Sequence, residues 1–212
     1  MKKIFFYVLA LSAVLFTACN SSSSKKEAES QEMNTIKKDS MPQATVPDNK
    51  EIKAVAVTYT NVDAKAAASL KEIVSHYLHI KNALANDNGS EAAGGAKVMS
   101  VILNKVDKSF FTAEQKKAYD DNEEVLKEHA EHIGKNGDKI KNQREHFAMM
   151  SEVVYELVKS FGTGLPIYHD HCPMYNDGKG AMWLSEMKEV KNPYYGAEMP
   201  KCGTVEEVIG PL

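Results

Sequence analysis

Between residues 63 and 161, apolar side chains recur every three to four residues in four segments separated by short breaks. This spacing places the apolar residues of each segment on one face of a helix. We therefore expect four helices, at residues 63–86, 90–108, 112–135 and 138–161. Asp63 fits an N-cap, and Thr112 with Gln115 fits a capping box. Four amphipathic helices joined by short links favour an up-down bundle.

The segment after Leu165 is rich in Pro and Gly, has no sustained period and contains two of the three cysteines. A segment this irregular needs packing against the bundle, a disulfide or a metal ion to fix its structure. We predict an all-α domain over residues 63–212, in which an irregular Cys/Met-containing C-terminal tail packs on a four-helix up-down bundle. About 150 residues are enough for one domain with a real core.

The N-terminus has the features of a secretory signal of the lipoprotein type, which we place at residues 1–18. Lys2 and Lys3 precede an apolar run at residues 4–16, and small residues lead to Cys19. The run is shorter than the roughly 20 residues that a membrane-spanning helix needs. We expect Cys19 to be lipidated and to anchor the chain to a membrane of the cell envelope, facing the periplasm or in the outer membrane. The alternative is a secreted protein from which Cys19 is removed.

Residues 19–62 are expected to be a disordered tether. Residues 20–48 consist mainly of Ser, Lys, Glu, Gln and Asn, a composition that cannot bury enough apolar surface to fold. Residues 50–60 alternate weakly and fit either a short strand or an extended lead-in. The net charge is −3 and no basic run is present, so nucleic acid is not an expected partner.

Two clusters in the tail contain potential metal ligands, His-Asp-His-Cys-Pro-Met at residues 169–174 and Met-Pro-Lys-Cys-Gly at residues 199–203. Thiolates and thioethers are soft ligands that favour cuprous copper, and imidazole adds capacity for zinc or cupric ion. The candidate ligands from these clusters are Cys172, Met174, Met199 and Cys202. Two other interpretations stay open: Cys172 and Cys202 form a structural disulfide, and the methionines fill gaps in the packing. His169 and His171 are either ligands or exposed loop residues.

The helices add three histidines. His129 lies in the apolar stripe of the third helix, and His132 shares its face because the two are three residues apart. His146 flanks the stripe of the fourth helix. Each is either a metal ligand or a core histidine bonded to a neighbour.

Signals for an enzyme are weak. The chain has no Gly-x-Ser-x-Gly, no phosphate-binding loop and no dinucleotide fingerprint. His171 and Cys172 are adjacent, and adjacent side chains on an extended chain point apart, so they do not form a nucleophile–base pair. We do not expect an enzyme.

Several segments together resemble a known bacterial domain family: Tyr-His-Asp-His-Cys-Pro-Met at 168–174, Trp-Leu-Ser at 183–185, Asn-Pro-Tyr-Tyr-Gly at 192–196, and the histidine-containing stretches 128–133 and 143–147. The family has no assigned function. It occurs as small lipoproteins and at the C-terminal end of periplasmic adaptors of copper/silver-type heavy-metal efflux pumps. The resemblance covers about residues 65–209. It implies an all-helical domain and the handling of copper or a related metal.

Cys-Pro-Met also resembles a short heavy-metal-binding motif of copper transport proteins. Relatives often have aromatic residues at positions 169 and 171, so the resemblance favours the Cys and Met side chains as ligands. The resulting hypothesis is a lipid-anchored envelope protein that binds copper, with zinc and silver as alternatives, for buffering or for delivery to efflux. The rival hypothesis is a metal-free interaction module of an efflux system with a Cys172–Cys202 disulfide.

Overall fold

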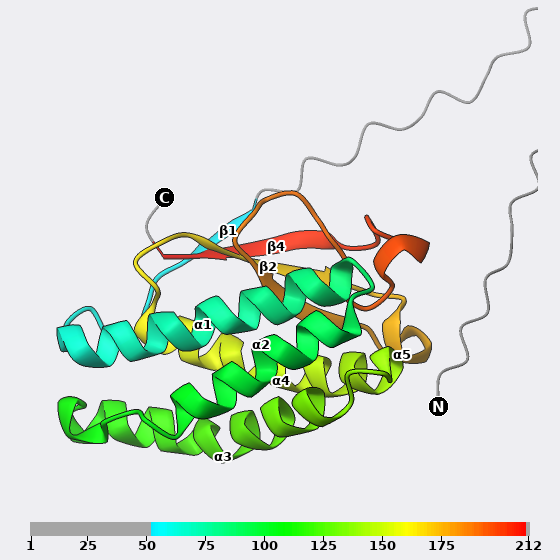
Figure 1. Cartoon of the computed structure of the whole chain (residues 1–212). Helices are drawn as coiled ribbons and strands as arrows, with labels where there is room; N and C mark the ends of the chain where they lie inside the picture. The colour runs from blue at the N-terminus through cyan, green and yellow to red at the C-terminus, as the bar shows by residue number, and fades with distance from the viewer. Residues whose placement is uncertain (1–51, 211–212) are drawn as a thin grey trace, which may run out of the picture. The chain divides into compact units, whose positions relative to one another are not determined.

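The structure, a computed structural model, describes residues 52–210. Four long helices lie side by side, with α2 and α3 on the side away from a small sheet (Figure 1). Their bounds are α1 (Ala64–Ala85), α2 (Gly89–Leu103), α3 (Ala113–Lys135) and α4 (Ile140–Phe161). None of the helices in this part of the chain is long and apolar enough to cross a membrane. Cys19 and the predicted signal lie outside the described residues, as does the tether up to residue 51.

Two of the predicted helix starts, those of α1 and α3, are confirmed by their caps. The Asp63 side chain accepts the backbone N–H of Lys65 at 2.7 Å. Thr112 and Gln115 form a complete capping box, in which each side chain accepts the backbone N–H of the other residue. These bonds satisfy N–H groups that a helix leaves free at its first turn.

Helix α2 differs from the prediction, because it ends at Leu103 and not near residue 108. Val98, an apolar residue in the middle of this helix, is 46% exposed. The buried face consists mainly of small residues, with Met99 and the last two residues of the helix beside them: Ala92, Ala93, Gly95, Ala96, Met99, Ile102 and Leu103. Small alanines give a weak periodic signal but let neighbouring helices approach closely.

The expectation of an all-α domain is wrong, because the tail forms most of a four-stranded sheet. The strands are β1 (Lys53–Val55), β2 (Ile167–Cys172), β3 (Ala181–Ser185) and β4 (Thr204–Ile209), in the order β1-β4-β2-β3. β1 pairs parallel with β4, and the other pairs are antiparallel. The strands have three to six residues each. Runs this short, with buried polar residues such as Asp170 and Ser185 among them, give no detectable period.

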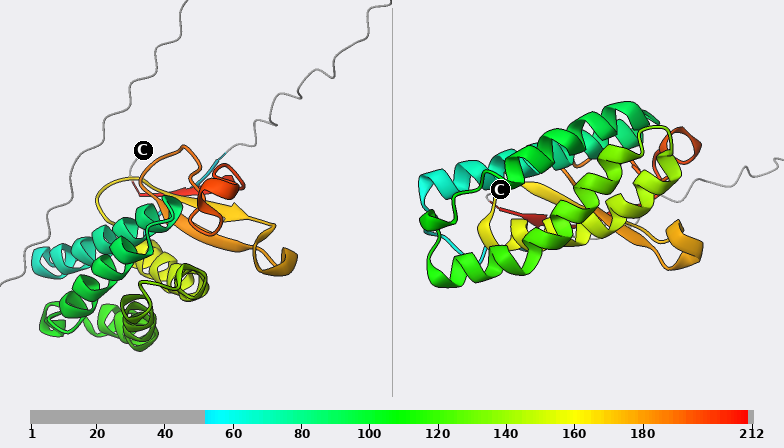
Figure 2. Two further views of the ribbon diagram at one scale, coloured as in Figure 1. Left: turned by 45° about the vertical axis from the view of Figure 1, so that its right-hand side comes forward. Right: turned by 60° about the horizontal axis from the view of Figure 1, so that its bottom comes forward.

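Strand β3 joins the sheet to the helices, because it packs against both α4 and α1. Figure 2 shows the sheet on one side of the helical layer. Trp183 and Leu184 are fully buried at this contact. The backbone N–H of Leu184 donates to the hydroxyl of Tyr77 at 2.9 Å, and that hydroxyl also bonds Ser151 of α4 at 2.8 Å. One tyrosine therefore connects α1, α4 and β3.

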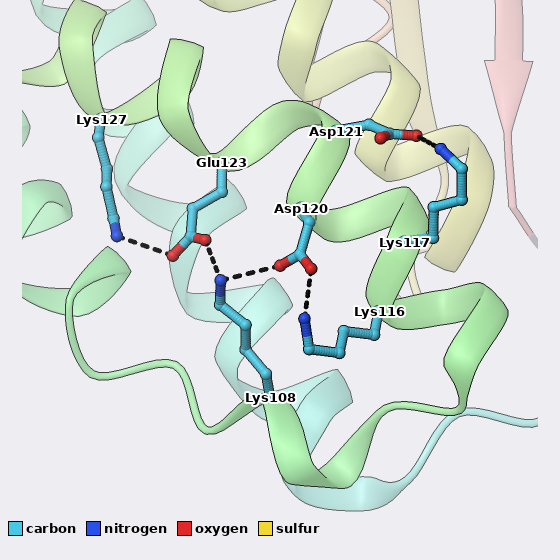
Figure 3. Close-up of polar contacts among 7 residues, drawn as sticks. All are labelled: Lys108, Lys116, Lys117, Asp120, Asp121, Glu123 and Lys127. Atoms are coloured by element: carbon cyan, nitrogen blue, oxygen red, sulfur yellow. Dashed lines mark hydrogen bonds and ion pairs between the residues drawn. The ribbon is translucent and has the colours of Figure 1, made fainter.

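A network of ion pairs fixes the link between α2 and α3 (Figure 3). Lys108 lies in a short 3₁₀ helix, η1 (Lys108–Phe110), and contacts Asp120 at 2.8 Å and also Glu123 of α3. Lys127 bonds the same Glu123 at 2.8 Å, and Lys116 pairs with Asp120. A single exposed ion pair contributes little to stability, whereas a network of several charges can contribute more. The link between α2 and α3 is therefore stabilised by the network in which three lysines share two carboxylates.

Candidate metal centre

Cys172 and Cys202 lie next to each other although 30 residues separate them in the chain. Cys172 is the last residue of β2, and Cys202 lies in the loop that leads into β4. Their sulfur atoms are 2.8 Å apart, and both are free thiols. Cys172 is fully buried whereas Cys202 is partly exposed, so solvent reaches the pair from the side of Cys202.

The distance between the two sulfur atoms lies between the values expected for two chemical states, a disulfide and a pair of metal-bound thiolates. A disulfide would bring the atoms to about 2.05 Å. Two thiolates on one tetrahedral ion would be about 3.8 Å apart, given metal–sulfur distances of about 2.3 Å. Either state needs a movement of about 1 Å or less, which a partly exposed loop residue such as Cys202 can make.

Met174 and Met199 flank the pair through their backbones. The backbone N–H of Met174 donates to the thiol of Cys202. The backbone N–H of Cys202 donates to the carbonyl of Met199 at 3.2 Å. The side chain of Met174 is 55% exposed, so it does not serve as a gap-filler in the core, whereas Met182 is buried in β3.

Asn192, which is not among the predicted site residues, holds the loop around Cys202. Its side chain is fully buried, and its amide donates to the carbonyl of Cys202 at 2.6 Å. Its side-chain oxygen accepts the backbone N–H groups of Tyr194 and Tyr195 at 2.7 and 3.1 Å. An Asn that bonds the backbone two residues ahead is typical of a turn, and the following Pro193 is the sequence signal for it.

Glycine follows Cys202 for a steric reason. Gly203 has φ +139°, and a Cβ there would lie 2.8 Å from the ring of Trp183 and 3.0 Å from the carbonyl of His171. No other residue fits this close approach of the loop to β2 and β3. The Cys-Gly sequence therefore brings the thiol against the sheet.

Charged groups connect the same loop to the helices at two places. At its start, Glu186 pairs with the fully buried Lys81 of α1 at 2.8 Å and accepts a bond from Asn82 at 2.8 Å. Burial lowers the pKa of Lys81, while the contacts with Asn82 and Lys81 outweigh burial and lower the pKa of Glu186.

Farther along the loop, Arg144 of α4 donates to the carbonyl of Pro193 at 2.8 Å and to Asp87 at 2.6 Å. Asp87 also accepts the backbone N–H of Ala197 at 2.9 Å. The bond from Ala197, followed by that from Arg144, lowers the pKa of Asp87. The loop that carries Cys202 is therefore fixed on α1 and α4 as well as on the sheet.

The surroundings of Cys202 favour its protonated thiol. Burial, together with the neighbouring Cys172, raises the pKa of Cys202 to about 11. Metal binding therefore has to release protons from the thiols, which makes the affinity depend on pH.

The three helix histidines form a second group, between α3 and α4. His129 Nδ1 lies 3.2 Å from His146 Nδ1, and the rings of His132 and His146 are stacked at 4.2 Å with an interplanar angle of 7°. Burial and the neighbouring imidazoles lower the pKa values of His129 and His146. Two ligand nitrogens on one tetrahedral ion are about 3.3 Å apart, so His129 and His146 are suitably spaced. The stacked His132 would have to rotate to join them, because the lone pairs of stacked rings do not converge.

The structure thus brings the cysteines together and the histidines together, as two groups. Within residues 52–210, no hydrogen bond or ring contact joins the histidine group to the sulfur pair. In the same part of the chain, no three His, Cys, Asp or Glu side chains are grouped so that they could hold a metal ion as they stand. Binding at either group would need side-chain movement.

No curated protein and no solved structure matches the chain. A family match covers most of the helical part, from within α1 to the residues just after α4. It includes His129, His132 and His146 but neither of the paired cysteines. Residues 73–164 match a family described as "Protein of unknown function (DUF3347)".

Proposed function

We propose that the protein binds one soft metal ion, copper before zinc or silver, at Cys172 and Cys202. The observation that carries the proposal is that two free thiols lie next to each other, one of them reachable from solvent. Thiolates are the ligands that cuprous ion prefers. Met174 and Met199, whose backbones bond Cys202, would supply thioether sulfur to complete the coordination.

The exposed side chain of Met174 supports this assignment. A methionine that is 55% exposed contributes little to packing, and a flexible thioether beside a thiol pair is suited to transfer of a soft ion. His129, His132 and His146 would serve the same metal-handling function as a separate imidazole group, suited to zinc or cupric ion.

The cellular role would be copper buffering or delivery to efflux. The lipoprotein-type N-terminus supports an envelope protein anchored through a lipid on Cys19, and the tether would let the domain reach a partner. The partner we propose is the periplasmic adaptor of a heavy-metal efflux pump, on the strength of the family resemblance.

The test is cuprous affinity of the full-length protein, purified in detergent under reducing conditions and titrated against a chromophoric copper chelator. We expect one copper per chain, with binding lost in Cys172→Ser and weakened in Met174→Leu. Met182→Leu is the matched control, because Met182 is buried in β3 and is expected to leave the affinity unchanged. Equal cuprous binding after replacement of both Cys172 and Met174 would show that the site is wrongly assigned.

A second candidate function is a metal-free interaction module closed by a Cys172–Cys202 disulfide. The sulfur separation of 2.8 Å favours it, because this distance is closer to a disulfide than to a pair of metal-bound thiolates. Mass spectrometry of protein isolated without reductant separates the two. An intact pair of thiols supports the metal site, whereas the loss of two hydrogen atoms supports the disulfide.

A further inference from the structure

A pocket of about 440 Å³ lies at the start of α4, and none of the candidate metal ligands lines it. Three segments that are distant in the sequence form its walls: the first turns of α4, the short helix α5 (Tyr175–Gly178), and the loop that ends in the 3₁₀ helix η2 (Gly196–Glu198). Figure 1 shows the three segments near the same end of the helical layer. Volumes of roughly 300–1,000 Å³ are typical of pockets for small molecules.

Three tyrosines line this pocket. Tyr175 stacks on Tyr194, with ring centroids 4.3 Å apart, and meets Tyr195 at an interplanar angle of 84° and a centroid distance of 6.1 Å. Tyr194 is buried, whereas Tyr175 and Tyr195 are partly exposed. The hydroxyl of Tyr195 donates to the carbonyl of Met174 at 3.0 Å, which fixes its ring. Two ring planes at nearly a right angle therefore form an aromatic corner in the wall of the pocket.

Each of the three segments also contributes one carboxylate to the pocket, Glu145 from α4, Asp177 from α5 and Glu198 from η2. All three residues are exposed at its rim. Their charges act on the aromatic corner. Burial, followed by the charge of Glu145, raises the pKa of Tyr175 to about 12. Burial, the two neighbouring thiols and then the carboxylates of α5 and η2 raise the pKa of Tyr195.

Two positive side chains, Arg144 and Lys141, line the pocket as well. Arg144 is already bonded elsewhere, because it pairs with Asp87 at 2.6 Å and donates to the carbonyls of Leu84 and Pro193 at 3.0 and 2.8 Å. Lys141 is exposed, and its flexible side chain can extend into water. With Arg144 neutralised by Asp87, the three carboxylates outnumber the one remaining cation. The pocket is therefore negative as well as aromatic.

We propose that this pocket binds a small organic cation of the quaternary ammonium class, with choline as the type. A quaternary ammonium has no N–H group to donate, so aromatic rings and nearby negative charge recognise it in place of directed hydrogen bonds. Tyr175 and Tyr195 would contact the cation, and the three carboxylates would supply the charge. The proposal does not depend on metal binding by the protein, because the cysteines and the helix histidines do not line the pocket.

The test is a titration of the full-length protein in a non-ionic detergent with choline, followed by saturation-transfer NMR of the ligand. The comparison ligand is the neutral analogue of choline in which carbon replaces the nitrogen, because it has the same shape without the charge. We expect saturable binding of choline at millimolar concentrations and none of the analogue. The absence of choline binding, or equal binding of the two ligands, would overturn the proposal.

Four variants assign the binding to this pocket. Tyr195→Leu should weaken choline binding at least about threefold, whereas Tyr195→Phe keeps the ring and should retain most of the affinity. Glu198→Gln should weaken binding about two- to fivefold, and Lys141→Gln should strengthen it by a similar factor, because each removes one charge at the rim. Glu198 and Lys141 are exposed, so these two variants test the site even if the leucine variant does not fold.

Glu72→Gln is the matched control for these variants. Glu72 is exposed on α1 and does not line the pocket, so its substitution removes one negative charge elsewhere and should leave choline binding unchanged. Binding that is weaker in Lys141→Gln, or unchanged in both Tyr195→Leu and Glu198→Gln, would show that choline does not bind in this pocket.

Discussion

Replacing Asn192 by Ala tests whether one buried amide positions Cys202. The substitution removes three hydrogen bonds, to the N–H groups of Tyr194 and Tyr195 and to the carbonyl of Cys202. Tyr194 is buried, so its unsatisfied N–H costs about 1–3 kcal/mol, whereas the two partly exposed groups can rebind water and cost about 0.5–1.5 kcal/mol each. The expected loss of unfolding free energy is therefore about 2–6 kcal/mol, a large share of the roughly 5–15 kcal/mol of a typical domain.

Two assays measure this prediction, urea unfolding for stability and the reaction rate of Cys202 with a chromogenic disulfide reagent under native conditions. The loop that carries Cys202 should loosen, so the thiol should react faster even where the protein is still folded. Asn104→Ala is the control, because Asn104 is exposed at the end of α2 and should change neither quantity. An Asn192→Ala protein with unfolding free energy within about 0.5 kcal/mol of the parent, and with the same thiol reactivity, would refute the reasoning.

Two further predictions concern the ties between this loop and the helices. Glu186→Gln should lower the unfolding free energy by about 3 kcal/mol, because it removes the carboxylate that pairs with the buried ammonium of Lys81. Lys81→Met should cost about 1 kcal/mol or less, because Glu186 is 35% exposed and still accepts a bond from Asn82. Equal losses in urea unfolding would contradict this asymmetry. The pKa of Asp87 is lower in the folded protein than in the unfolded chain, so the unfolded chain binds more protons as the pH falls. The stabilisation that the Asp87 carboxylate contributes is therefore present above about pH 4 and is lost as the pH falls below that value. Thermal unfolding between pH 3 and 6 should therefore show a steeper loss for the parent than for Asp87→Asn, and parallel curves would contradict the assignment.

The helical part of the fold was predictable because its signals are local. The caps at Asp63 and Thr112 are set by residues two or three positions away, and the stripes of α1 and α4 repeat over several turns. The sheet was not predictable for the opposite reason. Its strands are short, and β1 pairs with β4 across more than 150 residues, so the pairing depends on tertiary contacts that no local pattern encodes.

The candidate ligands were identified by residue type, but their grouping required the structure. The tail clusters suggested that Cys172 and Cys202 act together, and the structure places their sulfurs side by side. Asn192, which bonds Cys202, and Lys81, which fixes the start of the same loop, give no such signal. A buried lysine in α1 and an asparagine in a loop are ordinary in sequence, and only the arrangement of the loop on α1 and β2 shows what they bond.

The position of the sulfur pair has a consequence for stability that both functional proposals share. A bond between Cys172 and Cys202, made by a metal ion or by a disulfide, closes a loop between residues 30 apart. The chain-entropy relation for a disulfide gives about 3–4 kcal/mol for a loop of this size. Because the loop contains β3, which joins the sheet to α1 and α4, the gain acts on the whole tail. A higher unfolding temperature therefore supports a closed pair without distinguishing its chemistry. A cuprous chelator removes the stabilisation only if a metal closes the pair, and a thiol reductant removes it only if a disulfide does.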